Sequence, residues 1–507
     1  MTSRVVIRAI LVPVLAFAAL AAWALSSPVG ATPDEDFHLT SIWCAAGERT
    51  GLCEQSGDPT TRLVSPAFAK PPCYAWVSTE SAACQLDDLS STALVETTRG
   101  NFVGSYPPLF YGAMSIFATD DIAASVIVMR LMNALLFVAL MTALVVLLPE
   151  RHRPMAVLAY LVTLVPLGLF LVPSVNPSGW AIAGVGIAWM SLLGFVDRPD
   201  RARWGLAAVF VVSAVMAAGA RADAGVYVVL GIATVLFLRF ERSRRFGLDA
   251  ILPLAVALVC FVIVVSSAQL SSGLIGFGGT GSAPSVEGTD APPVPTGIGL
   301  MLTNIVNVPS IWAGALGSWN LGWFDTRLPA VVGLGGVAVF VAVATLGFAA
   351  FTARKALVFA GAAAALWFIP VYTLTRGGDP VGLEVQPRYL LPLMIMLAGF
   401  ALLAVGRWVV SLPLALRVTV GLTSAATQSL ALYVNLRRYV TGDDVTDINL
   451  NAGLEWWWNS VPSPMTVWAL GSLAWAALVT VLLWRPTVLL VPPIEPPAAR
   501  QPTPITR

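Results

Sequence analysis

Acidic residues and a histidine follow closely on the first apolar stretch of the chain, in the run Thr32-Pro33-Asp34-Glu35-Asp36-Phe37-His38. In a helix, Asp34 and His38 are four residues apart and project from the same face. A carboxylate and an imidazole held together in this way can act as a general base and the group that orients it. The run therefore marks Asp34, its neighbour Glu35, and His38 as candidate catalytic residues.

The same run carries the signals of a helix start. Thr32 suits the N-cap position, Pro33 suits the first helical position, and Glu35 completes a capping box. Acidic residues in a first turn also interact favourably with the helix dipole. This structural interpretation accounts for Thr32, Pro33 and Glu35 but leaves His38 unexplained.

Long apolar segments surround this run and dominate the chain. Of the 507 residues, 57% are hydrophobic and 11% are charged, and the mean hydropathy is +0.79. Apolar runs of about 18 or more residues are long enough to cross the hydrocarbon core as helices. We therefore predict an all-α polytopic membrane protein with about twelve transmembrane helices, in a range of about eleven to thirteen. The predicted spans are 7–26, 122–148, 154–172, 178–196, 205–220, 225–240, 248–267, 328–350, 357–375, 389–406, 418–436 and 465–484, of which 205–220 and 225–240 are short enough to be tilted or broken.

Charge distribution predicts how the spans are oriented. With a cytoplasmic N-terminus, most of the 29 basic residues fall in cytoplasmic segments, including the cluster Arg242, Arg244 and Arg245. Positive residues resist translocation, so this bias favours an inner (plasma) membrane protein with both termini in the cytoplasm. The net charge of +1 and the lack of a basic tract mean that membrane lipids, and no nucleic acid, are the expected partners.

This topology places the elaborate parts of the chain outside the cytoplasm. Residues 1–484 are predicted to form one transmembrane domain, with a large first extracytoplasmic loop at 27–121. A second outer loop, at 268–327, contains a Gly/Ser/Pro-rich stretch and is expected to be flexible. The proline-rich residues 485–507 are expected to form a disordered cytoplasmic tail.

Four of the five cysteines, Cys44, Cys53, Cys73 and Cys84, lie in the first outer loop. In an oxidising compartment they predict two disulfides, most simply 44–53 and 73–84. A zinc site is the alternative, but the spacings are long and His38 is the nearest histidine. We therefore favour the two disulfides.

A long first outer loop that opens with an acidic pair and a histidine resembles the GT-C superfamily of polytopic membrane glycosyltransferases. The likeness is nearest to a bacterial multi-spanning membrane family of unknown function. Three further segments are similar to it: Ser105-Tyr106-Pro107-Pro108-Leu109-Phe110-Tyr111, Val172-Pro173-Ser174-Val175-Asn176-Pro177, and Glu384-Val385-Gln386-Pro387-Arg388-Tyr389-Leu390-Leu391-Pro392. Ser178 stands where the nearest relatives carry an acidic residue.

The resemblance implies a sugar donor linked to polyprenyl phosphate and a cell-envelope glycan or lipid as acceptor. Asp34 corresponds to the catalytic aspartate that these enzymes place early in the first outer loop. Arginine matches the geometry and charge of phosphate oxygens, so the arginines at outer helix ends are candidate ligands of the donor phosphate: Arg388, Arg221 and Arg376. The similar segments supply the candidate substrate-binding residues: Tyr106, Asn176, Gln386 and Tyr389.

The implied reaction is direct displacement at the anomeric carbon. Asp34 takes the proton of the acceptor hydroxyl, and an arginine stabilises the charge of the departing phosphate. No cofactor is assigned, and a divalent cation held by Asp34 and Glu35 is an open alternative. The tryptophans at 312, 319, 323 and 456–458 could stack on sugar rings, although such residues more often form interfacial belts.

Arg130 lies about two turns inside the second predicted span. Because a charge in hydrocarbon is costly, we expect it to face a cavity or a partner.

Two other classes of function remain open. A transporter or flippase for a lipid-linked or envelope substrate would bury charges or broken helices near the midplane, whereas most charges here lie at outer helix ends. A non-catalytic assembly protein would leave the pairing of Asp34 and His38 without a purpose. We therefore expect a glycosyltransferase first and a transporter second.

Overall fold

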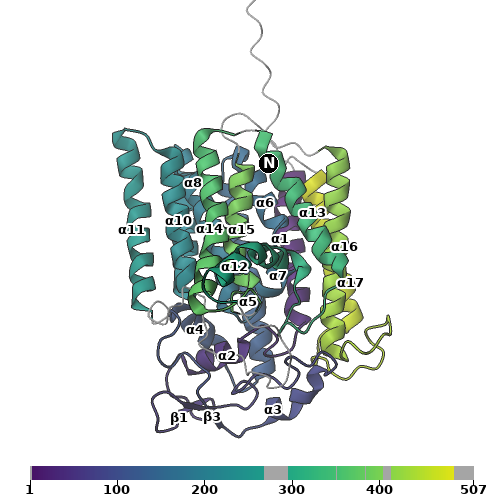
Figure 1. Cartoon of the computed structure of the whole chain (residues 1–507). Coiled ribbons are helices and arrows are strands. Elements are labelled where there is room, and N and C mark those ends of the chain that lie inside the picture. Colours follow the sequence, from purple (N-terminus) through teal and green to yellow (C-terminus); the bar gives the residue numbers. More distant parts are fainter. Residues whose placement is uncertain (1–2, 268–294, 350, 383, 404–412, 485–507) are drawn as a thin grey trace, which may run out of the picture.

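A computed structural model describes residues 3–267, 295–349, 351–382, 384–403 and 413–484. It confirms a mostly helical membrane protein, in which each of the predicted spans contains a helix (Figure 1). In this described part, nine helices are long and apolar enough to cross a membrane. The helices at the predicted spans are α1 (Ser3–Leu25), α5 (Ile122–Leu147), α6 (Arg153–Leu161) with α7 (Leu167–Leu171), α8 (Pro177–Asp197), α9 (Ala202–Ala220), α10 (Ala222–Arg239), α11 (Arg244–Ser266), α13 (Ala330–Ala344), α14 (Ala353–Gly377), α15 (Pro387–Leu402), α16 (Leu414–Val440) and α17 (Pro464–Trp484). The predicted tail, 485–507, lies outside the described residues.

Helix α8 is at the centre of the bundle, and 94% of its most apolar 18-residue stretch is buried. Small residues let a neighbouring helix approach closely. A Cβ atom added at Gly184 would lie 2.6 Å from the carbonyl oxygen of Ser213 on α9. Glycine is therefore required where α8 and α9 cross.

The break in the bundle lies in a different span from the two that we expected. Helices α9 and α10 are short, at 19 and 18 residues, as their sequences predicted, but neither is broken. The predicted span at 154–172 is instead divided into α6 and α7, with Pro166 between them. Proline lacks an amide hydrogen and clashes with the preceding turn, which explains the interruption.

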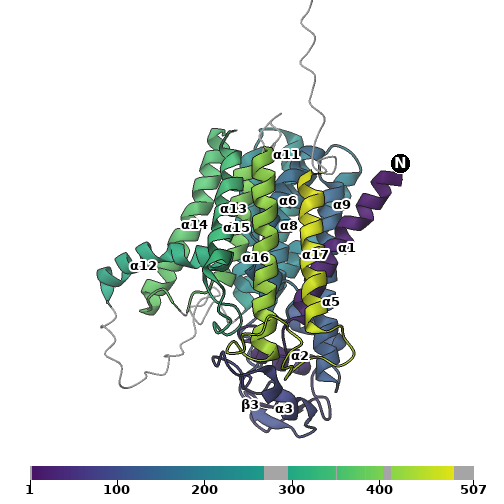
Figure 2. The ribbon, with the colours of Figure 1, turned by 90° about the vertical axis from the view of Figure 1, so that its right-hand side faces the viewer.

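The second outer loop contains a helix that the sequence analysis missed. The predicted flexible loop spans 268–327, but α12 (Gly297–Ala313) and a π-helical turn (Gly314–Ser318) occupy its second half. Figure 2 shows α12 running crosswise to the bundle. Its outward-facing residues are apolar (Ile298, 74% exposed; Val306, 74% exposed), as expected for a helix at a membrane boundary. The Gly/Ser/Pro-rich part of that loop, up to residue 294, lies outside the described residues.

The first loop forms a cap over one end of the bundle (Figure 1). We call this end of the bundle the loop face. The cap contains the helices α2 (Glu35–Cys44), α3 (Leu86–Ser90) and α4 (Leu109–Met114), and a small antiparallel sheet of β1 (Cys53–Gln55), β2 (Arg62–Val64) and β3 (Val95–Thr97). The register pairs Leu63 with Glu54 and Glu96.

Two disulfides hold the cap together. They join Cys44 to Cys53 and Cys73 to Cys84, the pairs that the spacing predicts. The zinc alternative is therefore excluded for these four residues.

Candidate functional site

Asp34 lies where the cap meets the bundle, immediately before α2. The sequence predicted that the helix begins after Thr32, but it begins at Glu35, and Asp34 takes the N-cap position in a left-handed conformation (φ 62°, ψ 14°). One half of the predicted capping box survives, because a Glu35 carboxylate oxygen accepts a hydrogen bond from the Thr32 amide at 2.8 Å. The left-handed residue turns the Asp34 carboxylate out of the helix, and 41% of this side chain is exposed.

Two arginines from distant parts of the chain hold the Asp34 carboxylate. The guanidinium of Arg388, on the first turn of α15, lies 2.6 Å from one oxygen, and that of Arg99, in the cap, lies 3.6 Å from the other. Arg388 is 4% exposed and also donates a hydrogen bond to the Pro33 carbonyl at 2.7 Å. Arg99 is fixed in turn by the buried Asp36, which it contacts through two nitrogens.

These charges set the protonation state of Asp34. Burial opposes ionisation of the carboxyl, but the positive charges around it, with Arg388 foremost, outweigh burial and lower its pKa. Asp34 is therefore a carboxylate at neutral pH.

His38 interacts electrostatically with Asp34 but stays unprotonated at neutral pH. Burial, with the charges of Arg388, Arg221 and Arg99, holds its pKa well below the usual value. Its Nδ1 atom lies 3.0 Å from the hydroxyl of Tyr111, so the ring is neutral and oriented by that hydroxyl.

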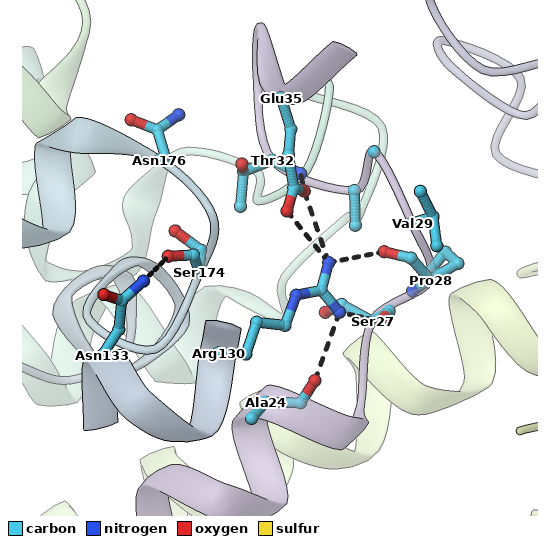
Figure 3. Close-up of polar contacts among 12 residues, drawn as sticks. Ala24, Ser27, Pro28, Val29, Thr32, Glu35, Arg130, Asn133, Ser174 and Asn176 are labelled. Carbon is cyan, nitrogen blue, oxygen red and sulfur yellow. Dashed lines mark hydrogen bonds and ion pairs between the residues drawn. The ribbon is translucent and has the colours of Figure 1, made fainter. Parts of the chain in front are cut away.

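Glu35 points toward Arg130 on α5 (Figure 3). Its side chain is 0% exposed, and one carboxylate oxygen lies 3.1 Å from the guanidinium of Arg130, which is 2% exposed. Arg130 also donates hydrogen bonds to the carbonyls of Ala24 and Pro28, at 3.2 and 2.6 Å, and to that of Ser27. This pair ties α5 to the chain between α1 and α2, and it provides the partner that we expected for Arg130. We accordingly assign Glu35 a structural role in place of the catalytic role expected from the sequence.

The carboxylates of Asp34 and Glu35 do not form a joint metal site. Arg130 and the Thr32 amide contact the Glu35 oxygens, whereas Arg388 and Arg99 contact those of Asp34. Among the described residues, no group of three or more His, Cys, Asp or Glu side chains could hold a metal ion.

Another buried arginine, Arg221, lies near Arg388. Arg221, between α9 and α10, pairs with Asp223 through two nitrogens at 2.9 and 3.1 Å. Its guanidinium lies 4.6 Å from the centre of the Tyr389 ring and 5.9 Å from that of Tyr106. The Arg388 guanidinium lies 5.0 Å from the same Tyr389 ring, so cation–π contacts join the two arginines through one tyrosine.

Asn176 has a positioning role at this site. Its side-chain oxygen caps α8 by accepting from the Ser178 amide at 2.9 Å, and its nitrogen donates to the Pro33 carbonyl at 3.0 Å. Arg388 donates to that same carbonyl, so two elements fix the residue before Asp34.

Arg376 is separate from this group. It is exposed and donates to the hydroxyl of Tyr372 one turn earlier on α14, at 2.8 Å. No contact in the described part of the chain joins it to Asp34 or Arg388, so the geometry does not support Arg376 as a ligand of the same phosphate.

A narrow, mostly apolar pocket opens beside Arg388 and Pro33. One wall is the broken span, through Leu167, Phe170 and Leu171, and the opposite wall is the segment after α12, including Trp319 and Phe324. Gln386, the residue just before α15, lines the pocket together with Arg388. The site thus combines a carboxylate, a buried arginine and an apolar pocket at the loop face of a membrane bundle.

The model of the family described as "Predicted membrane protein (DUF2142)" matches residues 17–397. The chain belongs to this family. No curated protein and no solved structure matches it. The matched segment includes Asp34, Arg99, Arg221 and Arg388, so the whole candidate site of this DUF2142 protein lies within the part that defines the family.

Sequence reasoning missed two residues of the candidate site in this DUF2142 protein, Arg99 beside Asp34 and Tyr111 beside His38. Arg99 follows β3 in the cap, about 65 residues after Asp34 in the chain, and no local pattern connects the two. Tyr111 was quoted in an aromatic segment without a role, yet its hydroxyl orients His38. Each contact depends on the tertiary fold of the cap, and the hydropathy pattern of the sequence does not predict that fold.

Proposed function

We propose that the protein is a membrane glycosyltransferase of the GT-C type that moves a sugar from a polyprenyl-phosphate donor to an acceptor of the cell envelope. The observation that carries this proposal is the Asp34–Arg388 pair, in which the Asp34 side chain is 41% exposed and the arginine is buried beside an apolar pocket. A carboxylate can accept a proton, and a buried guanidinium can bind a phosphate group. Both lie at the end of the bundle that we infer to be extracytoplasmic.

The reaction that fits these groups is a single displacement. The acceptor hydroxyl gives its proton to Asp34, and its oxygen forms a bond to the anomeric carbon of the donor sugar. The bond between that carbon and the phosphate oxygen breaks, and its electron pair leaves with the polyprenyl phosphate. Arg388 stabilises the charge that develops on the leaving phosphate. A single carboxylate is sufficient for this reaction, because Asp34 accepts the proton and the positive charge of Arg388 stabilises the leaving group.

Donor binding would also strengthen the base. In the free protein Arg388 contributes to the lowered pKa of Asp34, and a carboxylate with a low pKa is a weak base. A phosphate bound to Arg388 places a negative charge beside the pair, which raises the pKa of Asp34. The carboxylate therefore becomes a better proton acceptor once the donor is in place.

The test compares purified wild type with Asp34→Asn and Arg388→Gln, using radiolabelled polyprenyl-phosphate sugars and membrane extract as acceptor. We expect wild type to transfer one of the sugars, Asp34→Asn to bind the donor without transfer, and Arg388→Gln to bind it weakly. Arg376→Gln is the matched control, because Arg376 is exposed and bonds only to Tyr372 among the described residues. Equal transfer by wild type and Asp34→Asn would refute the proposal.

A transporter of lipid-linked substrates is the second candidate. The observation in its favour is the break between α6 and α7, because interrupted helices often form the substrate sites of transporters. Three buried arginines near the site, however, have carboxylate partners: Arg130 with Glu35, Arg221 with Asp223, and Arg388 with Asp34. Such ion pairs hold the arginines in place, which suits a rigid catalytic site better than a transporter site that must change conformation.

A further inference from the structure

A strained hairpin supplies one wall of the pocket beside Arg388. Leu321 and Thr326 bond to each other through both backbone amides, at 3.1 and 3.3 Å. Between them, Gly322 and Phe324 take left-handed conformations, with φ values of 62° and 63°. This region is unfavourable for a bulky residue such as phenylalanine, so the surrounding structure must hold Phe324 in place.

Contacts on its buried side hold the hairpin. Asp325 lies 2.8 Å from the guanidinium of Arg438 on α16 and accepts from the Trp76 amide at 3.1 Å. The indole of Trp323 donates to the Gly30 carbonyl at 2.9 Å. These bonds fix the hairpin to the cap and to the bundle, and they leave its other side free to line the pocket.

Three of the non-glycine residues with positive φ belong to the pocket or to the elements that contact its lining residues. In the described part of the chain there are four: Asp34, Trp76, Phe324 and Ser460. Asp34 carries the candidate base, Phe324 lines the pocket, and Trp76 bonds to the base of the hairpin. Strained backbone of this kind is concentrated at functional sites, where it orients side chains for a ligand.

The hairpin presents an aromatic pair to the pocket. The rings of Trp319 and Phe324 have centroids 6.1 Å apart and meet edge to face, at 72°. Both side chains line the pocket that also contains Arg388 and Gln386. The aromatic surface therefore lies next to the group that we assign to the donor phosphate.

Two polar atoms of residues that line the pocket have no partner in the described part of the chain. They are the side-chain oxygen of Gln386 and the Nε atom of Arg388, both buried. A buried acceptor without a donor is costly, so a ligand that supplies a hydroxyl to Gln386 and an anion to Arg388 would be favoured. An isoprenoid chain has no hydroxyl to give, whereas a sugar joined to phosphate has both groups.

We propose that Trp319, Phe324 and Gln386 form the sugar-recognition subsite of the donor site. The apolar face of the sugar ring packs on the aromatic pair at the mouth of the pocket, and one ring hydroxyl donates to Gln386. The inference rests on the proposed function, because it places the sugar by reference to the phosphate at Arg388. Specificity for one sugar then depends on which hydroxyl reaches Gln386.

The experiment measures binding of matched lipids to the purified full-length protein. The probes are short-chain polyprenyl methyl phosphate and the same lipid phosphate carrying mannose, glucose, galactose or arabinofuranose in place of the methyl group. All are monoanionic diesters, so the ratio of their Kd values isolates the contribution of the sugar. We expect wild type to bind at least one glycosylated lipid about tenfold more tightly than the methyl ester, which corresponds to about 1.4 kcal/mol.

Two variants test the assigned residues. Trp319→Leu removes the aromatic face, and Gln386→Met removes the acceptor at a position that makes no side-chain cap bond to α15. Each should abolish the preference for the glycosylated lipid, which is measured as the ratio of its Kd to that of the methyl ester for the same variant. Trp204→Leu is the control, because Trp204 is 65% exposed at the start of α9.

The outcomes separate this inference from the function on which it rests. If wild type binds the methyl ester and every glycosylated lipid equally well, or if both variants keep the preference, the subsite is refuted while phosphate binding stands. If wild type binds none of the lipids, the donor site itself is refuted, and the subsite with it.

Discussion

Replacing Glu35 distinguishes a structural carboxylate from a catalytic one. In Glu35→Gln the buried guanidinium of Arg130 keeps its carbonyl partners but loses the negative charge 3.1 Å away. Removing one partner of a buried ion pair costs about 3–5 kcal/mol. Because the glutamine amide can still accept a hydrogen bond, we expect a loss at the lower end, about 3 kcal/mol of unfolding free energy.

Arg130→Met provides the second arm of a double-mutant cycle. It leaves the Glu35 carboxylate, which is 0% exposed, with the Thr32 amide as its described bonding partner. The double variant contains no unpaired buried charge, so its loss should be smaller than the sum of the single losses by about 2 kcal/mol or more. The carbonyls of Ala24 and Pro28 lose their donor in both arginine variants, so the double variant will not recover wild-type stability.

The assay is unfolding in mixed micelles, followed by tryptophan fluorescence and far-UV circular dichroism. Glu48→Gln is the matched control, because Glu48 is an exposed carboxylate of the same cap, and it should change stability by less than about 0.5 kcal/mol. The reasoning fails if Glu35→Gln unfolds like wild type. Unchanged stability with lost sugar transfer would return Glu35 to the catalytic machinery.

Three other predictions concern Asp34 and the disulfides. Asp34→Asn should keep the fold, because asparagine tolerates the left-handed conformation, whereas Asp34→Ala should unfold about 1–2 kcal/mol more easily in the same micelle assay; equal stability of the two would contradict the assigned backbone. Replacing both Cys73 and Cys84 by serine opens a link with a sequence separation of 11 and should cost about 3 kcal/mol, and an unchanged unfolding midpoint would argue against the bond. Because Arg388 helps to hold the pKa of Asp34 low in the free protein and bound phosphate offsets it, the acid limb of kcat should lie at higher pH than that of kcat/KM. Coincident limbs in a pH–rate profile would contradict that coupling.

The helices of the bundle could be predicted because a long apolar run in the local sequence is enough to identify a membrane span. The disulfides followed from short spacings within one loop. Asp34 and Arg388 were each selected from a motif, and the structure brings them within 2.6 Å although they are far apart in the chain.

The features that were missed depend on three-dimensional context. Helix α12 was taken as loop because its sequence follows a Gly/Ser/Pro-rich stretch, and its orientation is set by contacts such as the bonds of Asn304 to Asp379 and Val381. The side to which Glu35 points could not be read from a helical wheel, because the helix starts later than the capping signals predict. Asp34 has a left-handed backbone conformation and precedes the helix, whereas Glu35 is the first residue of the helix, so the two neighbouring carboxylates have different partners.

The most direct test of the account uses the protein reconstituted in lipid vesicles with a labelled polyprenyl-phosphate sugar and an envelope acceptor. Mass spectrometry would follow the acceptor and the released polyprenyl phosphate together. The account predicts that wild type produces glycosylated acceptor and polyprenyl phosphate in equal amounts, and that Asp34→Asn produces neither. Movement of the intact lipid-linked sugar across the bilayer, with no product formed, would contradict the account and support a transporter.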